Sequence, residues 1–338
     1  MKRLLVLALC LTLLTGCTVP ERELTKYSAT FLELFDTVTT VMGYAEDEET
    51  FTATANGIRD SLEHYHRLFD IYNSYDGLNN LKTVNDSAGI APVQVDEAII
   101  CLLLDCCRYY ELTQGKVNVA MGSVLSLWHD ARNDGLNNPA AATVPRQEAL
   151  LEAAAHTAFE SLVIDVEKGT VFLSDPAARL DVGAVAKGWS AQRVAQAAPE
   201  GLLLSVGGNV CATGPKADGS PWVIGVQDPD DPDAYLHTLN LSSGSVVTSG
   251  DYQRAFVVDG ELYHHIIDPV TLYPSRLWRS VTVVCPDSGL ADALSTALFL
   301  LPREQGQALL ESCGAQAMWV GPGGEQGYSP GFHDLIRN

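Results

Sequence analysis

The spacing of apolar residues changes several times along this chain, and that change most constrains its fold. Residues 27–43 alternate and are rich in Thr, Val and Phe, which predicts a strand. Residues 49–68 carry apolar side chains at spacings of three and four, which predicts an amphipathic helix. Further helices are predicted over residues 96–112, from near 145, and over 184–198, 287–301 and 304–313.

Short apolar segments that end in turns predict further strands. A hairpin is predicted over residues 161–175, with its turn at Lys168-Gly169, and other strands lie within 201–209, 221–228, 237–250, 254–268 and 280–286. Residues 123–128 form a short apolar segment, and 131–145 are predicted to be a loop because they are polar and rich in Asn, Gly and Pro. Strands and helices in this mixed order, joined by short turns, predict an α+β fold with mixed or antiparallel sheets flanked by helices.

The N-terminus has the layout of a secretory signal. Two basic residues precede an apolar run over residues 4–14, which is shorter than the roughly 20 residues that a spanning helix needs. Residues 14–17 read LTGC and resemble a lipobox, so we expect cleavage before Cys17 and lipidation of its thiol. The predicted organisation is a signal peptide over 1–16, a lipidated cysteine and tether over 17–28, and one folded domain over 29–338.

This interpretation places the domain at the cell membrane, lipid-anchored on the extracytoplasmic face. An ordinary secretory peptide or an uncleaved anchor is the alternative. Beyond Cys10 and Cys17 the chain has six cysteines, without the Cys/His spacing of a zinc site. Three of them, Cys101, Cys106 and Cys107, lie in an apolar helical segment, where we expect buried small side chains.

The charge of the chain limits its ligands. The sequence has 21 basic and 42 acidic residues, a formal net charge of −21, which opposes binding to nucleic acid and polybasic contact with anionic lipid. An anionic substrate would need a metal ion or a local group of donors to offset this charge.

Four charged residues stand inside otherwise apolar segments: Asp181, Lys187, Asp268 and Asp292. Burying an unpaired charge is costly, so each implies a ligand, a metal ion or an ion pair. For Lys187 the structural alternative is an ion pair with Asp181.

Asp292 and Thr296 are four residues apart on a predicted helix and therefore share a face. A carboxylate and a hydroxyl on one face favour a hard cation such as Mg²⁺, which is usually completed by water and substrate phosphates. The alternative is a pair of polar residues that cap the helix or face solvent. His264 and His265 precede an Asp-Pro turn and are candidate general bases.

Taken together, the motifs of this chain resemble the ApbE family. They occur in the family's order and cover nearly the whole mature chain: an FxxY-type segment at 69–72, GSVLSLW (122–128), LDVGAVAKG (180–188), LLLSVGGN (202–209), VVTSGDYQR (246–254), HHIIDP (264–269) and ADALSTAL (291–298). The resemblance implies an ApbE-like flavin transferase fold. It also implies Mg²⁺-dependent transfer of FMN from FAD to a Thr or Ser hydroxyl of an exported or membrane flavoprotein, with release of AMP.

The resemblance also implies the site residues. Those expected to contact FAD are Met42, Tyr72, Ala120, Met121, Gly122, Asp181, Lys187 and Ile267. Metal ligands are expected to be Asp292, Ser295, Thr296 and the backbone carbonyl of Ala184. Asp292 and His265 are the expected catalytic residues, with His265 as base toward the acceptor hydroxyl.

The chain departs from the family pattern at three places. Val117-Asn118 replaces the common Phe-Asp, AMGSVL at 120–125 replaces TVGPL, and the turn DPVTLYP lacks the usual glycine. Two rival functions stay open at this point. One is a Mg²⁺-dependent FAD pyrophosphatase that gives FMN and AMP, and the other is a non-catalytic flavin-binding lipoprotein.

Overall fold

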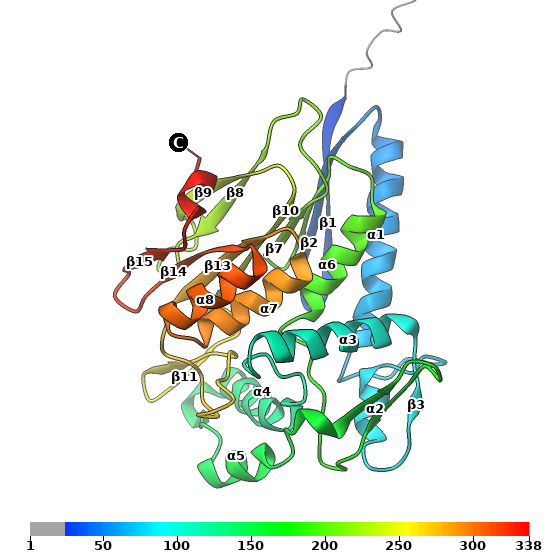
Figure 1. Cartoon of the computed structure of the whole chain (residues 1–338), viewed down its shortest axis with the longest axis vertical. Helices are drawn as coiled ribbons and strands as arrows, with labels where there is room; N and C mark the ends of the chain where they lie inside the picture. The colour runs from blue at the N-terminus through cyan, green and yellow to red at the C-terminus, as the bar shows by residue number, and fades with distance from the viewer. Residues whose placement is uncertain (1–23, 338) are drawn as a thin grey trace, which may run out of the picture.

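An eight-stranded sheet organises the molecule, and every neighbouring pair of its strands is antiparallel (Figure 1). This computed structural model describes residues 24–337. In spatial order the strands are β1 (Thr25–Leu34), β2 (Thr37–Ala45), β6 (Leu203–Val206), β7 (Asn209–Ala212), β10 (Gly244–Gly250), β13 (Ser280–Cys285), β14 (Gln316–Val320) and β15 (Gln326–Tyr328).

Helices cover one face of this sheet. They are α1 (Glu48–Phe69), α6 (Ala186–Ala197), α7 (Ser288–Phe299) and α8 (Arg303–Cys313). Figure 1 shows α7 and α8 in front of the strands and α1 beside β1. The hairpin of β8 (Trp222–Gln227) and β9 (Tyr235–Leu241) packs on the other face, together with the short helix Phe332–Leu335. Both faces of the central strands are therefore buried, which agrees with the near-continuous burial of β13.

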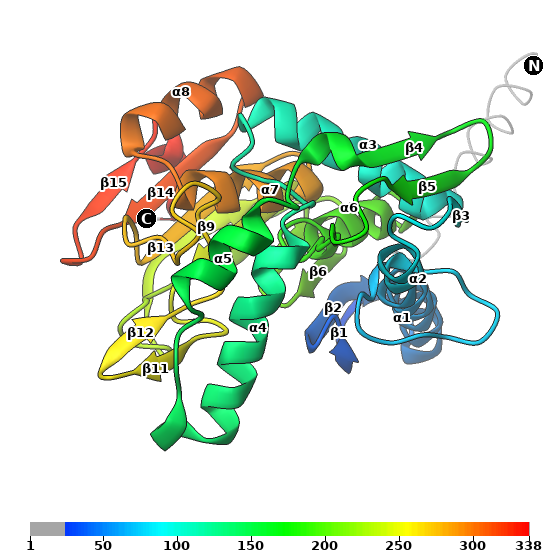
Figure 2. The same cartoon turned by 90° about the horizontal axis from the view of Figure 1, so that it is seen from below.

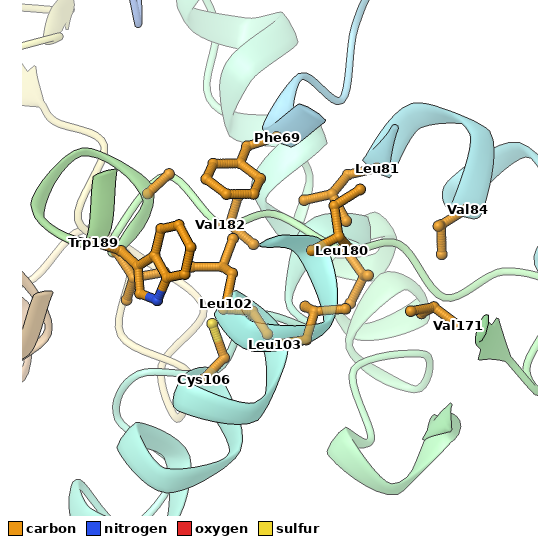
Figure 3. Packing of buried hydrophobic residues seen from close by; sticks show 14 of the residues in the cluster. Phe69, Leu81, Val84, Leu102, Leu103, Cys106, Val171, Leu180, Val182 and Trp189 are labelled. Atoms are coloured by element: carbon orange, nitrogen blue, oxygen red, sulfur yellow. The ribbon is translucent and has the colours of Figure 1, made fainter. Parts of the chain in front are cut away.

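A second group of elements packs beneath the helical face. It comprises α2 (Leu81–Asp86), α3 (Glu97–Leu112), α4 (Gly122–Asn137), α5 (Gln147–Ala154), β3 (Val93–Gln94), β4 (Leu162–Asp165) and β5 (Thr170–Leu173). Figure 2 shows α4 and α5 beside the hairpin of β11 (Phe256–Val258) and β12 (Glu261–Tyr263). Figure 3 shows that Phe69 of α1 and Trp189 of α6 share one apolar core with Leu102 and Leu103 of α3, so this core joins the two groups.

The structure confirms the α+β class, and most of the predicted helices and strands are present. Two predictions were wrong. Residues 27–43 form two strands, because Phe35 and Asp36 adopt positive φ angles of 53° and reverse the chain. The helix α4 continues through Asn137, so residues 131–137 are helical rather than a loop.

The predicted signal peptide, Cys17 and the first part of the tether lie outside the described residues. Within residues 24–337, no helix is both long and apolar enough to cross a membrane.

Candidate functional site

A cavity of about 640 Å³ lies between the helical face of the sheet and the second group of elements. Its wall includes the β1–β2 turn, the segment after α1, the inner face of α4, the start of α6 and one face of α7. Small-molecule sites commonly measure about 300–1,000 Å³, so the cavity can hold a ligand of nucleotide size.

Close packing of α6 against α7 brings Asp292 into this wall. A Cβ atom on Gly188 would lie 2.3 Å from the carbonyl oxygen of Ser288, so only glycine allows the two helices to approach this closely. The Gly188 amide donates a hydrogen bond of 2.8 Å to Oδ2 of Asp292, and Lys187 Nζ lies 4.0 Å from the same oxygen. The structural alternative for Lys187, an ion pair with Asp181, is not found, because the ion pair of Lys187 is with Asp292.

Asp292 is 4% exposed, and burial raises the pKa of its carboxyl despite the nearby Lys187 charge. Thr296 lines the cavity one turn further along α7, and no hydrogen bond of its hydroxyl is found within residues 24–337. Ala184 lines the cavity as well, and the Gly188 amide that would close a helical turn onto its carbonyl instead donates to Asp292.

These three oxygen donors suit a hard cation better than zinc. Among the described residues there is no group of three or more His, Cys, Asp or Glu placed to hold a metal ion. Mg²⁺ is typically held by one or two carboxylates and completed by water and phosphate oxygens, so a single buried carboxylate beside a hydroxyl and a carbonyl fits it. Ser295 lies behind them, 0% exposed, and hydrogen-bonds to Ser249 at 2.8 Å rather than facing the cavity.

The two histidines differ in what their ring nitrogens can do. Nε2 of His264 donates to the Ser275 carbonyl at 2.7 Å, and its Nδ1 accepts from the Ile266 amide at 3.2 Å, so both nitrogens are used. Nδ1 of His265 donates to the Gln253 carbonyl at 3.2 Å, which fixes the tautomer and leaves the lone pair of Nε2 available. His265 is therefore the better placed base.

The pKa of His265 is lowered to about 3. The main cause is desolvation of the ring by the surrounding protein, which disfavours the charged imidazolium. The positive charges of Arg254 and Lys187 lower the pKa further. The low pKa keeps the imidazole neutral, and the His265 side chain is exposed in the cavity wall, so its Nε2 lone pair is accessible to a ligand.

The segment before α4 supplies another part of the wall. The Asp181 amide donates to the Val119 carbonyl at 2.8 Å, which aligns this segment with residues 179–181. The Asp181 carboxylate accepts from the Gly183 amide and faces the cavity, and burial raises its pKa. At the predicted departure from the family, Asn118 accepts from the Ala120 amide at 2.9 Å and so still orders the turn.

Most of the predicted site residues meet at this cavity. Those in its wall are Tyr72, Met121, Asp181, Ala184, Lys187, His265, Ile267, Asp292 and Thr296. Ala120 and Gly122 flank Met121 but lie outside the wall, as does Ser295. Asp268, the fourth charge noted in an apolar segment, forms an ion pair of 3.2 Å with Lys116 and needs no ligand.

Met42 is not brought to the site. It packs against the apolar cluster under the β8–β9 hairpin, because alternation along β2 turns its side chain to that face of the sheet. The hairpin of β1 and β2 instead contributes Phe35 and Asp36 at its turn.

Sequence reasoning missed two arginines of the wall, Arg132 on α4 and Arg254 after β10. Only the meeting of these distant segments reveals them, although Arg254 ends the motif VVTSGDYQR. Arg254 also has a positive φ of 46°, which is uncommon for a residue other than glycine.

Comparison with known proteins places this site in a family. The sequence profile of the ApbE family matches residues 34–319. The FAD:protein FMN transferase of Treponema pallidum is 36% identical over 277 residues, which cover 76% of this chain and 75% of the relative. The FAD:protein FMN transferase of Klebsiella pneumoniae is 34% identical over 258 residues, covering 72% and 77%.

Solved structures agree with this comparison. The crystal structure of the ApbE protein from Thermotoga maritima superposes with a TM-score of 0.83 at 32% identity, covering 93% of this chain and 100% of that one. The flavin transferase ApbE from Vibrio cholerae, at 24% identity and a TM-score of 0.75, shares the fold. The relatives confirm the prediction that this protein is an enzyme of the transferase class. Because the family profile spans most of its length, the chain belongs to the ApbE family.

Proposed function

We propose that this protein transfers FMN from FAD to a Ser or Thr hydroxyl of another protein, with Mg²⁺ bound at Asp292 and with release of AMP. The observation that carries the proposal is the buried Asp292 carboxylate, which faces the same cavity as a histidine with a free ring nitrogen. The names of the relatives support FAD as the donor and a protein as the acceptor.

Asp292, Thr296 and the carbonyl of Ala184 would hold the magnesium ion. When bound, the ion offsets the negative charge of the diphosphate and stabilises the departing phosphate. Lys187, 4.0 Å from Asp292, contributes a second positive charge beside that position. These charges counter the net charge of −21, which otherwise opposes an anionic substrate.

His265 acts on the acceptor. Its Nε2 takes the proton of the Ser or Thr hydroxyl while the hydroxyl oxygen bonds to the FMN phosphorus. The bond from that phosphorus to the bridging oxygen breaks, and AMP leaves with the electron pair. The Gln253 carbonyl holds the imidazole ring in the tautomer that this step requires.

The acceptor is proposed to be an exported or membrane-bound flavoprotein. This rests on the signal-like N-terminus and the expected lipid at Cys17, which would anchor the enzyme on the extracytoplasmic face of the cell membrane.

Mass spectrometry separates this function from its rivals. Full-length protein is incubated with FAD and Mg²⁺, with and without a candidate acceptor, beside an Asp292→Ala variant. An acceptor heavier by one FMN, with equimolar AMP and neither product from the variant, supports the transferase. Free FMN and AMP regardless of acceptor identify a pyrophosphatase, and bound intact FAD without turnover identifies a flavin-binding protein.

A further inference from the structure

Two arginines face the cavity without an acidic partner. Arg132 and Arg254 form no ion pair among residues 24–337, although this chain has twice as many acidic as basic residues. Burial lowers the pKa of Arg132, the nearby Arg254 charge lowers it further, and the Asp36 carboxylate acts in the opposite direction without forming an ion pair. Two unpaired like charges in one cavity wall are unfavourable unless an anion joins them.

The contacts of Arg254 leave most of its donors unused. Its Nη2 donates to the Phe35 carbonyl at 3.2 Å, which directs the guanidinium across the cavity from the loop after β10 toward the β1–β2 turn. A guanidinium has five N–H donors, so four remain for a ligand. The charge of Arg254 is felt by both His265 and Asp292, which places it near the reacting groups.

Arg132 also orients two neighbouring side chains of the cavity wall, His129 and Tyr72. Its Nη2 lies 3.2 Å from Nε2 of His129, and Nδ1 of His129 lies 3.0 Å from the Tyr72 hydroxyl. Arg132 can only donate, and its Nη2 lies closer to Nε2 of His129 than to Nδ1, at 3.2 Å against 3.5 Å, so Nε2 is the acceptor. Nδ1 then carries the proton and donates it to the Tyr72 oxygen. The hydroxyl proton of Tyr72 is then free for a ligand, and its pKa is raised, so the group stays a donor.

We propose that Arg254, Arg132 and Tyr72 form a phosphate-recognition element that binds the diphosphate of the flavin dinucleotide, with His129 as a positioning residue. Three convergent donors with two fixed positive charges match phosphate oxygens, which guanidinium groups bind in bidentate geometry. The inference rests on the proposed function, since it takes the donor substrate of that reaction as its ligand.

Flavins with different numbers of phosphates test this element directly. Binding of riboflavin, FMN and FAD to the full-length protein is followed by quenching of flavin fluorescence, for the wild type and the variants Arg254→Gln and Arg132→Gln. Loss of one charged hydrogen-bonding group is expected to raise the Kd for FAD about tenfold or more and to leave the Kd for riboflavin unchanged. Arg254→Lys keeps the positive charge but loses the bidentate donor geometry of the guanidinium, so its Kd for FAD is expected to lie between those of the wild type and Arg254→Gln.

Arg59→Gln is the matched control. The Arg59 side chain on α1 is 43% exposed, pairs with Asp60 at 2.7 Å and lies outside the cavity wall, so all three affinities should stay unchanged. Equal losses of affinity for riboflavin and FAD would overturn the proposal, because they would show that the variants disturb the part of the site that binds the flavin ring. Unchanged FAD affinity with a raised KM for the acceptor would also overturn it, by assigning the arginines to an acidic acceptor segment.

The proposed function and this element fail in different ways. Arginine-dependent FAD binding without FMN transfer to any acceptor would reject the function and retain the element. FMN transfer with FAD affinity independent of both arginines would reject the element and retain the function.

Discussion

The backbone amide of Gly188 on α6 lies 2.8 Å from the carboxylate of Asp292 on α7, across a helix contact that has no room for a side chain. A Cβ atom added to Gly188 would meet the Ser288 carbonyl oxygen at 2.3 Å and Cβ of Asp292 at 2.5 Å. The packing of two helices thus fixes the position of the proposed metal ligand, and stability and activity are coupled at this contact.

Gly188→Ala is expected to separate α6 from α7, lower the free energy of unfolding by about 1–3 kcal/mol and reduce FMN transfer. Gly57→Ala is the matched control, because Gly57 is an exposed residue within α1 and a Cβ atom added there would have nothing within 4 Å. There the change should stabilise the protein by up to about 1 kcal/mol through helix propensity. Urea unfolding and AMP release measure both effects, and equal stability of the two variants would contradict the coupling.

Asp292→Asn is expected to reduce Mg²⁺-dependent AMP release by about two orders of magnitude or more, because the variant loses the only carboxylate of the proposed metal site. Without Mg²⁺ the same variant should bind FAD as tightly as the wild type or more tightly, since a negative charge beside the diphosphate is gone. Fluorescence titration with and without Mg²⁺ measures this.

Asp287→Asn at the start of the same helix is the control for that experiment. Asp287 caps α7 by accepting from the Leu290 amide at 2.8 Å, and asparagine caps helices equally well. Its Mg²⁺ dependence should match the wild type. Loss of Mg²⁺ dependence in both variants would assign the effect to the helix rather than to the carboxylate.

How far the sequence predicts this fold depends on how local each signal is. The bounds of α1 are predictable to within one residue at each end, because apolar side chains recur at helical spacing along it. The extension of α4 escapes prediction because residues 131–137 are polar and include Gly135. The structure explains that glycine by a tertiary contact, since a Cβ there would lie 2.8 Å from the Phe256 ring.

Whether a site residue can be predicted from the sequence also depends on how local its signal is. Asp292 and Thr296 are predictable because four residues separate them on one helix, and the structure places both in the cavity wall. Arg132 and Arg254 are 122 positions apart in sequence numbering and meet only in the folded chain, so no local pattern links them. The reversal at Phe35-Asp36 lacks the Gly or Asn that usually marks a positive φ, which hides the contribution of this turn.

The pH dependence of turnover should depend on whether FAD is bound. In the free enzyme the pKa of His265 is about 3, so the base stays neutral and kcat/KM should show no acid limb from His265 between pH 8 and 5. The bound diphosphate offsets the charges of Arg254 and Lys187, which favours the protonated imidazole, so the acid limb of kcat should lie at higher pH than that of kcat/KM.

Arg254→Gln removes one of the charges that lower this pKa, so it should move the acid limb of kcat/KM to higher pH. Initial rates of AMP release in the presence of acceptor give both profiles, measured over a pH range that extends below the His265 pKa of about 3. His265→Asn is the control, with kcat reduced by about two to four orders of magnitude. An unmoved acid limb in Arg254→Gln would contradict the electrostatic argument.

Leu272 occupies the turn position at which the family usually has glycine, and it does so with a φ of 64°. The turn is held at this residue, since its amide donates to the Asp268 carbonyl at 2.8 Å and its own carbonyl accepts from the Trp128 indole at 2.9 Å. The left-handed conformation costs a side-chain-bearing residue about 1–2 kcal/mol. The leucine side chain, 8% exposed and packed with Trp128, offsets this cost.

Both Leu272→Ala and Leu272→Gly should therefore destabilise the protein, but glycine less than alanine by about 1 kcal/mol, because only glycine also removes the backbone strain. Leu150, a fully buried helical residue of the same apolar cluster, should show the opposite order, with alanine more stable than glycine. Urea unfolding of the four variants measures both differences. If alanine is the more stable replacement at both positions, the side chain at 272 bears no conformational strain and the missing glycine has no energetic consequence.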